Sequence, residues 1–214
     1  MTARRRRSIV LVGAAVVLDY ATALIASALT LPFYLDTWAT STAVVVGGLP
    51  VGIAAGVLYN LLMAATVWGP AAAVWCVSSA TAAACTWFFF RRGWVSIERP
   101  FAMVASGVLT GLVNGCLSFV IYLVVFGSAP AVDNTRAFRE LLQASLGSSG
   151  FALLCASLMI EVADKTVSII TAAATAFLLR DAYRWTREHR PGDGARATPS
   201  LLTSPVRRPS RAAR

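Results

Sequence analysis

The stretch WATSTAVVVGGLPVGIAAGVLYNLLMAATV, residues 38–67, is apolar almost throughout and is interrupted by GGLP at 47–50. As one continuous helix it would extend about 45 Å at roughly 1.5 Å per residue, which is too long for a bilayer without strong tilt. A break at Gly47, Gly48 and Pro50 would give two helices, of which the first is short. The number of membrane crossings in the chain therefore depends on this stretch.

The composition of the whole chain is that of a membrane protein. Its 214 residues are 57% hydrophobic and 14% charged, and the mean hydropathy is +0.67. Soluble domains carry about a quarter charged residues. Apolar stretches long enough to cross a hydrocarbon core of roughly 30 Å recur along the sequence. We therefore expect a polytopic helical membrane protein.

The placement of basic residues decides between the two interpretations of 38–67, because cytoplasmic loops are enriched in Lys and Arg. With a break at 47–50, the RRRR run at 4–7, the loop RRGWVSIER at 91–99 and the basic C-terminal tail all lie in the cytoplasm. With one crossing, the arginines of 91–99 would move outside. We predict an all-α membrane protein, a six-transmembrane-helix bundle with both termini cytoplasmic, whose spans are roughly 8–30, 37–48, 50–67, 70–90, 99–126 and 150–182.

The chain divides into three segments by composition: a basic cytoplasmic N-terminus (1–7), the six-helix membrane domain (8–182) and a basic tail (183–214). The start resembles a secretory signal, but its apolar run continues too far, which indicates an uncleaved first helix. The tail is rich in Pro, Arg, Ser, Thr and Ala, so we expect it to be disordered in the cytoplasm. The net charge of +9 lies mainly at the two ends, which favours contact with anionic lipid over nucleic acid.

Several chemistries have no support in the sequence. The cysteines form no CxxC pair, which argues against a metal site. The only histidine is in the polar tail, and no GxxxxGK[ST], HExxH or GxSxG motif is present. We therefore expect neither an enzyme nor a cofactor. The residues concerned are Cys76, Cys85, Cys116, Cys155 and His189.

The sequence EVADK, 161–165, places three charged residues in the last apolar segment. On a helix, Glu161 and Asp164 share a face, and Glu161 and Lys165 can pair at i,i+4. A charge at membrane depth costs about 2.5–3.5 kcal/mol on insertion scales. The cluster therefore indicates either a water-filled cavity with mutual pairing or the boundary between two helices at the interface. In the second case 150–160 would be a separate turn, with a bend near 147–150.

Other polar residues interrupt the apolar helices. Asp19, near the middle of the first span, could face a polar cavity, bond to another helix or be a protonated buried acid. Asn60 and Asn114 lie in small-residue helices, where an amide often bonds across helices. The pairs of glycines in GIAAG (52–56) and GVLTG (107–111) are typical of surfaces where helices pack closely.

The order of several stretches resembles the substrate-binding S-components of energy-coupling-factor vitamin transporters, and the related membrane domains of sensor kinases. The resemblance covers about residues 8–182. Its residues are LPFYLDTWAT (31–40), GGLPVGIAAGVLYNLL (47–62), the Arg-bounded turn, GLVNGCLSFVIYLVVFG (111–127) and EVADKTVSIITA (161–172).

This resemblance implies a function and a site. The chain would be a subunit of the cell membrane that captures a vitamin-like small molecule from outside, for ATP-driven uptake with a separate coupling subunit and ATPases. The substrate-binding residues it implies are a cap of Tyr34, Asp36, Thr37 and Trp38, a wall of Glu161, Asp164 and Lys165, and Asn60.

Two alternatives stay open. S-components often carry AxxxA on the first helix, and here the nearest pairs are Thr22/Ala26 and Ala23/Ser27. The chain could instead be a membrane sensor or interaction module without transport. It could also be a small ion-coupled transporter that uses Asp19 and Glu161.

For Tyr34 and Trp38, the alternative to a ligand cap is an interfacial aromatic belt.

Overall fold

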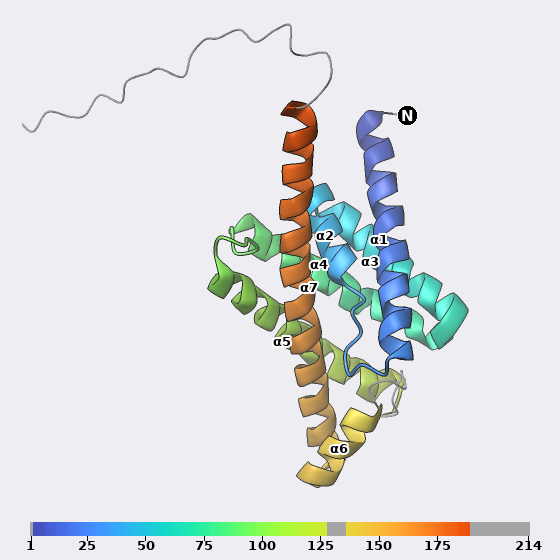
Figure 1. Ribbon diagram of the computed structural model, residues 1–214. Coiled ribbons are helices and arrows are strands. Elements are labelled where there is room, and N and C mark those ends of the chain that lie inside the picture. The colour runs from blue at the N-terminus through green and yellow to red at the C-terminus, as the bar shows by residue number, and fades with distance from the viewer. Residues whose placement is uncertain (1, 128–135, 189–214) are drawn as a thin grey trace, which may run out of the picture. The chain divides into compact units, whose positions relative to one another are not determined.

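The computed structural model describes residues 2–127 and 136–188, and this part of the chain contains helices and no strands. Residues 1–179 form one compact unit, to which the following description applies. The helices are α1 (Ala3–Ala28), α2 (Trp38–Gly47), α3 (Leu49–Met63), α4 (Trp75–Arg91), α5 (Pro100–Val125), α6 (Arg136–Leu146) and α7 (Ser149–Glu188) (Figure 1). A π-helical turn, Ala64–Trp68, extends α3, and a 3-10 turn, Pro70–Val74, precedes α4.

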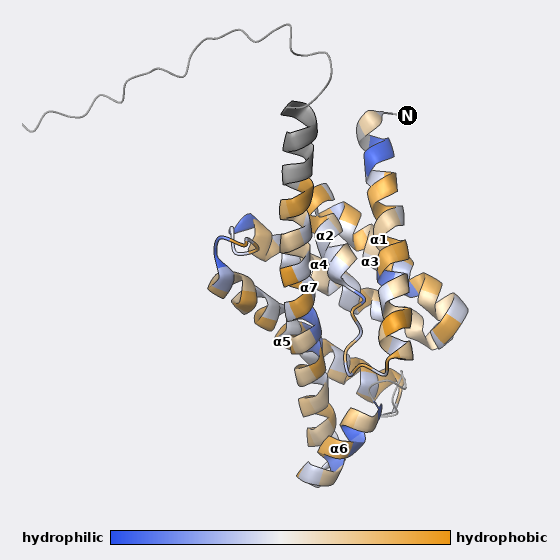
Figure 2. Cartoon of the chain, in the orientation of Figure 1, coloured by the Kyte–Doolittle hydropathy of each residue, from blue (hydrophilic) through white to orange (hydrophobic). Residues whose placement is uncertain are grey.

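Within residues 2–127 and 136–188, four segments are long and apolar enough to cross a membrane: Arg5–Ala28, Leu49–Trp68, Pro70–Arg91 and Pro100–Val125. The prediction of an all-helical chain with apolar spanning helices is confirmed. Figure 2 shows that hydrophilic residues gather at the start of α1, in the loop between α4 and α5, midway along α7 and on α6. The count of six crossings stays a prediction.

The helix break expected at GGLP is present. Helix α2 ends at Gly47, and α3 begins at Leu49 with Pro50 in its first turn. Gly48 between them has φ of 91°, a conformation that side chains other than glycine rarely adopt. The proline is suited to the first turn because the N–H it lacks would have no partner there. In GIAAG, a Cβ added to Gly56 would lie 2.8 Å from the Cβ of Ser79 in α4, so this segment does pack closely.

Helices α5 and α7 are in backbone contact through a seam of three glycines. A Cβ added to Gly107 would lie 2.5 Å from the Cα of Thr166, and one on Gly115 would lie 2.8 Å from the Cα of Leu158. At Gly111 the added atom would overlap Val162. The prediction that GVLTG forms a packing surface is confirmed.

The last helix differs from the expectation. Helix α7 is continuous from Ser149, so 150–160 is not a separate turn, and the charged cluster lies inside the helix. The bend precedes it at Gly147, whose φ is 69°. Helix α6 was not predicted, because the sequence from 127 to 149 was treated as a connection. Helix α7 also includes 183–188, and the remainder of the expected disordered tail, 189–214 with His189, lies outside the described residues.

Candidate functional site

The connector between α1 and α2 folds into the bundle and is held there by two hydrogen bonds at Leu35. Its backbone N–H donates to Asp164 Oδ1 at 2.7 Å, and its carbonyl accepts from the hydroxyl of Thr22 at 2.7 Å. Leu35 has φ of 50°, in the left-handed region that residues other than glycine rarely adopt. Asp36 and Thr37 are buried, and the Thr37 hydroxyl contacts that of Ser168 at 3.1 Å.

The connector forms one wall of a cavity between α3, α4 and α7. The space between its walls that is free of atoms, including the open mouth, is about 370 Å³. Only about 20 Å³ of this space can hold the centre of a water molecule. Small-molecule sites in proteins have volumes of roughly 300–1,000 Å³. The space open to water is far smaller than this, so the cavity lacks room for a small molecule in this form. Its lining residues are Tyr34, Asp36, Thr37, Asn60, Trp68, Trp75, Ser78, Ser79, Glu161 and Lys165.

Three carboxylates surround the ammonium group of Lys165. The distance from Lys165 Nζ is 2.6 Å to Asp164 Oδ2, 3.2 Å to Glu161 Oε2 and 3.8 Å to Asp36 Oδ1. All four side chains are nearly inaccessible to solvent. Because acids outnumber the base, the cluster favours a bound proton or a cationic group.

The surroundings of Asp36 raise the pKa of its carboxyl group. Asp36 lies in the connector, outside the helices, and burial raises its pKa to about 7. The attraction of Lys165 opposes this rise, whereas repulsion from Asp164 and Glu161 adds to it. Asp36 therefore holds a proton more tightly than an exposed aspartate does.

Three lining residues each have a buried polar atom without a hydrogen-bond partner among the described residues. These atoms are the acceptors Asp36 Oδ1 and Glu161 Oε2 and the donor Trp75 Nε1. Buried polar atoms in folded proteins are nearly always hydrogen-bonded, so exceptions that cluster at a cavity indicate a site for a polar molecule. A molecule in this cavity would meet two acceptors and one donor.

The remaining oxygens of the two carboxylates are held by neighbouring helices. Glu161 Oε1 accepts from the hydroxyl of Ser118 at 2.7 Å, across the seam with α5. Asp36 Oδ2 accepts from the hydroxyl of Tyr59 at 3.3 Å. Each carboxylate therefore has one oxygen fixed by the fold and one oxygen without a hydrogen bond.

The asparagines link the polar wall of α4 to its neighbours. Asn60 Nδ2 donates to Ser79 Oγ at 2.6 Å and to the carbonyl of Gly56 at 2.9 Å. Asn114 Oδ1 accepts from the hydroxyl of Ser78 at 2.9 Å. Both amides therefore make the bonds across helices that the sequence indicated.

No family model, no curated protein and no solved structure matches the chain. The resemblance to S-components therefore stays a prediction that rests on the residues quoted for it.

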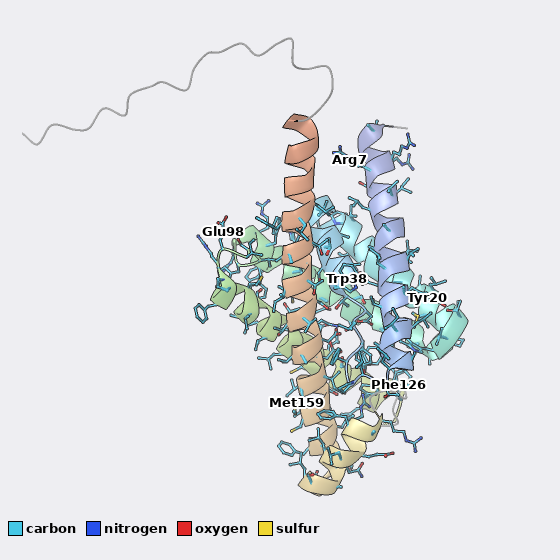
Figure 3. The ribbon with its side chains drawn as sticks, viewed as in Figure 1. Arg7, Tyr20, Trp38, Glu98, Phe126 and Met159 are labelled. Atoms are coloured by element: carbon cyan, nitrogen blue, oxygen red, sulfur yellow. The ribbon has the colours of Figure 1, made fainter. Side chains whose placement is uncertain are left out.

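Six of the eight residues implied as substrate-binding line the cavity: Tyr34, Asp36, Thr37, Asn60, Glu161 and Lys165. Asp164 is fully buried but is not among the lining residues, because its oxygens are bonded to Leu35 and Lys165. Trp38, at the start of α2 (Figure 3), donates its Nε1–H to the Thr22 hydroxyl at 3.2 Å and does not line the cavity.

Asp19 has a structural role in the described fold. Its carboxylate accepts the backbone N–H groups of Ala39 and Thr40, both at 2.9 Å, and the Thr40 hydroxyl at 2.7 Å. These N–H groups belong to the first turn of α2 and have no acceptor within the helix. Asp19 therefore caps α2 from a neighbouring helix.

Four lining residues were missed by the sequence analysis: Trp68, Trp75, Ser78 and Ser79. The adjacent serines in an otherwise apolar helix were the available signal, because hydroxyls in spans often mark contacts between helices. Among the described residues, no group of three or more His, Cys, Asp or Glu side chains could hold a metal ion.

Proposed function

We propose that the chain is a membrane-embedded binding protein of the S-component type, which captures a vitamin-like small molecule from outside the cell. Delivery would require a separate coupling subunit and ATPases. The observation that carries the proposal is the buried polar cavity, in which Asp36 Oδ1, Glu161 Oε2 and Trp75 Nε1 lack hydrogen-bond partners among the described residues. Such atoms are retained in a fold where a polar ligand completes them.

We further propose six crossings with both termini in the cytoplasm. The ten residues of α2 extend only about 15 Å at roughly 1.5 Å per residue, about half of a hydrocarbon core. Helix α2 would therefore be a short crossing whose outer end meets the connector. The arginines in the first two turns of α1 and those in the loop between α4 and α5 would lie inside. The connector and α6 would then lie at the outer side.

The chemistry of the cavity favours a ligand with a cationic or donor-rich group. Asp36 and Glu161 each offer a carboxylate oxygen that faces Lys165 as an ion pair but accepts no hydrogen bond. Trp68 and Trp75 supply aromatic walls. Because the cavity lacks room for such a ligand in this form, the connector would move outward to admit it. The two hydrogen bonds of Leu35 would break in this movement.

The direct test is mass spectrometry of small molecules released from the protein purified from its native membrane. Glu161→Gln keeps the size of the side chain but removes its charge, and it should abolish retention of the released molecule. Glu140→Gln is the matched control, because Glu140 is exposed and pairs only with Arg136 on α6. If no molecule is retained, or if both variants retain it equally, the proposal is wrong.

The orientation has its own test. In a variant without native cysteines, a single cysteine at Ser145 of α6 should react with an impermeant thiol reagent on intact cells. A cysteine at Glu98, in the loop between α4 and α5 (Figure 3), should react only after the membrane is opened. The reverse pattern would place the cavity on the cytoplasmic side and contradict capture from outside.

A small proton-coupled transporter is the second candidate, and the observation that favours it is the carboxylate cluster around Lys165. Acids that share one base can exchange a proton for a ligand. Proton-driven uptake into proteoliposomes that contain this chain alone would favour this function. Uptake that requires ATPases would favour the S-component type.

A further inference from the structure

Arg139 is the one buried charge of helix α6. Its side chain is 9% exposed, whereas its neighbours Arg136 and Glu140 are more than 60% exposed and pair with each other at 2.9 Å. An amphipathic helix at a membrane surface normally turns its charges outward. Arg139 is therefore placed against the bundle at some cost in free energy.

The surroundings of Arg139 do not supply a counter-charge. Its guanidinium carbon lies 3.7 Å from the ring centroid of Tyr122, and no carboxylate of the described residues lies within 4.0 Å. Its Nε, Nη1 and Nη2 have no hydrogen-bond partner among the described residues. A ring face attracts a guanidinium but accepts none of its five N–H donors in the way that an oxygen does. A buried, unpaired cation is strongly unfavourable.

Arg139 lies one aromatic ring away from the cavity. Tyr122, over which it stacks, has its hydroxyl 3.2 Å from that of Tyr34 and its ring centroid 5.2 Å from that of Trp75. Both Tyr34 and Trp75 line the cavity. The two hydroxyls use one of their hydrogens on each other, so Arg139 and the one remaining hydroxyl hydrogen are the donors beside this wall, in which only Tyr34 lines the cavity.

We propose that Arg139, with the remaining hydroxyl hydrogen of the Tyr34 and Tyr122 pair, binds an anionic group of the ligand, a carboxylate or a phosphate. The cationic or donor-rich group of the same ligand contacts Asp36 and Glu161. The substrate class is thus a dipolar small molecule with charges at its two ends. The planar fork of a guanidinium matches two oxygens of either anion. This inference rests on the proposed function of the cavity.

The test uses two probes of the same shape. Para-(aminomethyl)benzoate carries an ammonium and a carboxylate, and para-(aminomethyl)benzamide carries the ammonium alone. Binding is followed by the tryptophan fluorescence of the protein, to which Trp68 and Trp75 in the cavity wall contribute, in detergent and in phosphatidylcholine nanodiscs. The wild type should bind the benzoate about tenfold or more tighter than the benzamide, because a hydrogen bond between charged groups contributes that much.

Variants on α6 identify the residue responsible. Arg139→Gln should remove the preference for the benzoate and leave benzamide affinity within about twofold. Arg139→Lys, which keeps the charge without the fork, should retain part of the preference. Arg136→Gln is the matched control and should leave the preference unchanged. Thermal unfolding of each variant confirms that it is folded. If Arg139→Gln does not fold, the preference for the benzoate is measured in Arg139→Lys instead.

The outcomes separate this inference from the proposed function. If the benzamide binds and Asp36→Asn weakens it, but the benzoate is not preferred, the cavity binds ligands and the anion site is wrong. If the preference appears in detergent and disappears in nanodiscs, a lipid phosphate occupies Arg139 and the inference is also wrong. If neither probe binds at concentrations up to its solubility, the dipolar substrate class is rejected, while mass spectrometry still decides the proposed function.

Discussion

Asp164 of α7 accepts a hydrogen bond at 2.7 Å from the backbone N–H of Leu35, a residue 129 positions earlier in the chain. The same carboxylate holds the ammonium of Lys165 through its other oxygen at 2.6 Å. One buried acid thus fixes both the connector and the base at the centre of the cavity. Asp164 positions the site, although it does not line the cavity itself.

Asp164→Ala should therefore destabilise the protein by about 1–3 kcal/mol, because the substitution leaves the N–H of Leu35 without its acceptor. Lys165 would keep Glu161 and Asp36 as partners. Asp164→Asn should cost less, since its amide oxygen can still accept from Leu35. Thermal unfolding in detergent measures both changes. The control Glu140→Ala breaks an exposed pair and should stay within about 1 kcal/mol of the wild type. Equal stability of all three variants would contradict the structural role of Asp164.

Asp19→Ala should cost about 2 kcal/mol, because it removes the cap of α2 and leaves two buried N–H groups without an acceptor. Asp19→Asn keeps one acceptor oxygen and should cost less. Thermal unfolding again provides the measurement. A wild-type melting temperature for both variants, together with lost proton-driven flux, would instead identify Asp19 as an ion site.

Gly111→Ala should separate α5 from α7, because a Cβ at this position overlaps the backbone of Val162. Overpacking of this kind costs about 1–3 kcal/mol. Gly13→Ala in α1 is the matched control: nothing lies within 4 Å of the added atom, and alanine favours the helix. The melting temperature should fall for the first variant and stay level or rise for the second. A similar shift in both would show that the seam is not closely packed.

Stability and ligand binding should depend on pH in opposite directions through Asp36. Its pKa in the folded protein is about 7, above the ordinary value of about 3.9, so the folded state binds this proton more tightly than the unfolded state. The resulting stabilisation is complete below about pH 4 and is lost as the pH rises through about 7. The melting temperature of the wild type should therefore fall more than that of Asp36→Asn between pH 5 and pH 8.

The affinity for a cation should rise as the pH rises. Para-(aminomethyl)benzamide stays protonated across this range, and it should bind the wild type more tightly as Asp36 loses its proton. Asp36→Asn should show a flat profile, measured by tryptophan fluorescence between pH 5 and pH 8. Wild-type affinity that is independent of pH would mean that Asp36 does not contact the cation.

The sequence was informative about the site where polar residues stood out against an apolar background. Asp36, Glu161 and Lys165 were recognisable because charge is rare in this chain, and all three line the cavity. Ser78 and Ser79 were missed, since small polar residues are common in packed helices. Arg139 was missed because the segment that carries it was treated as a connection.

By itself, the sequence determined the helical class and the break at GGLP, because both follow from local properties: apolar length, and the backbone freedom of Gly48 beside a proline. It also determined which helix surfaces could pack closely. Only the tertiary structure decided the partners. Asp19 and Asp164 are both buried acids, yet one caps α2 and the other holds Leu35, because a carboxylate binds whichever donors the packing of distant segments brings within about 3 Å.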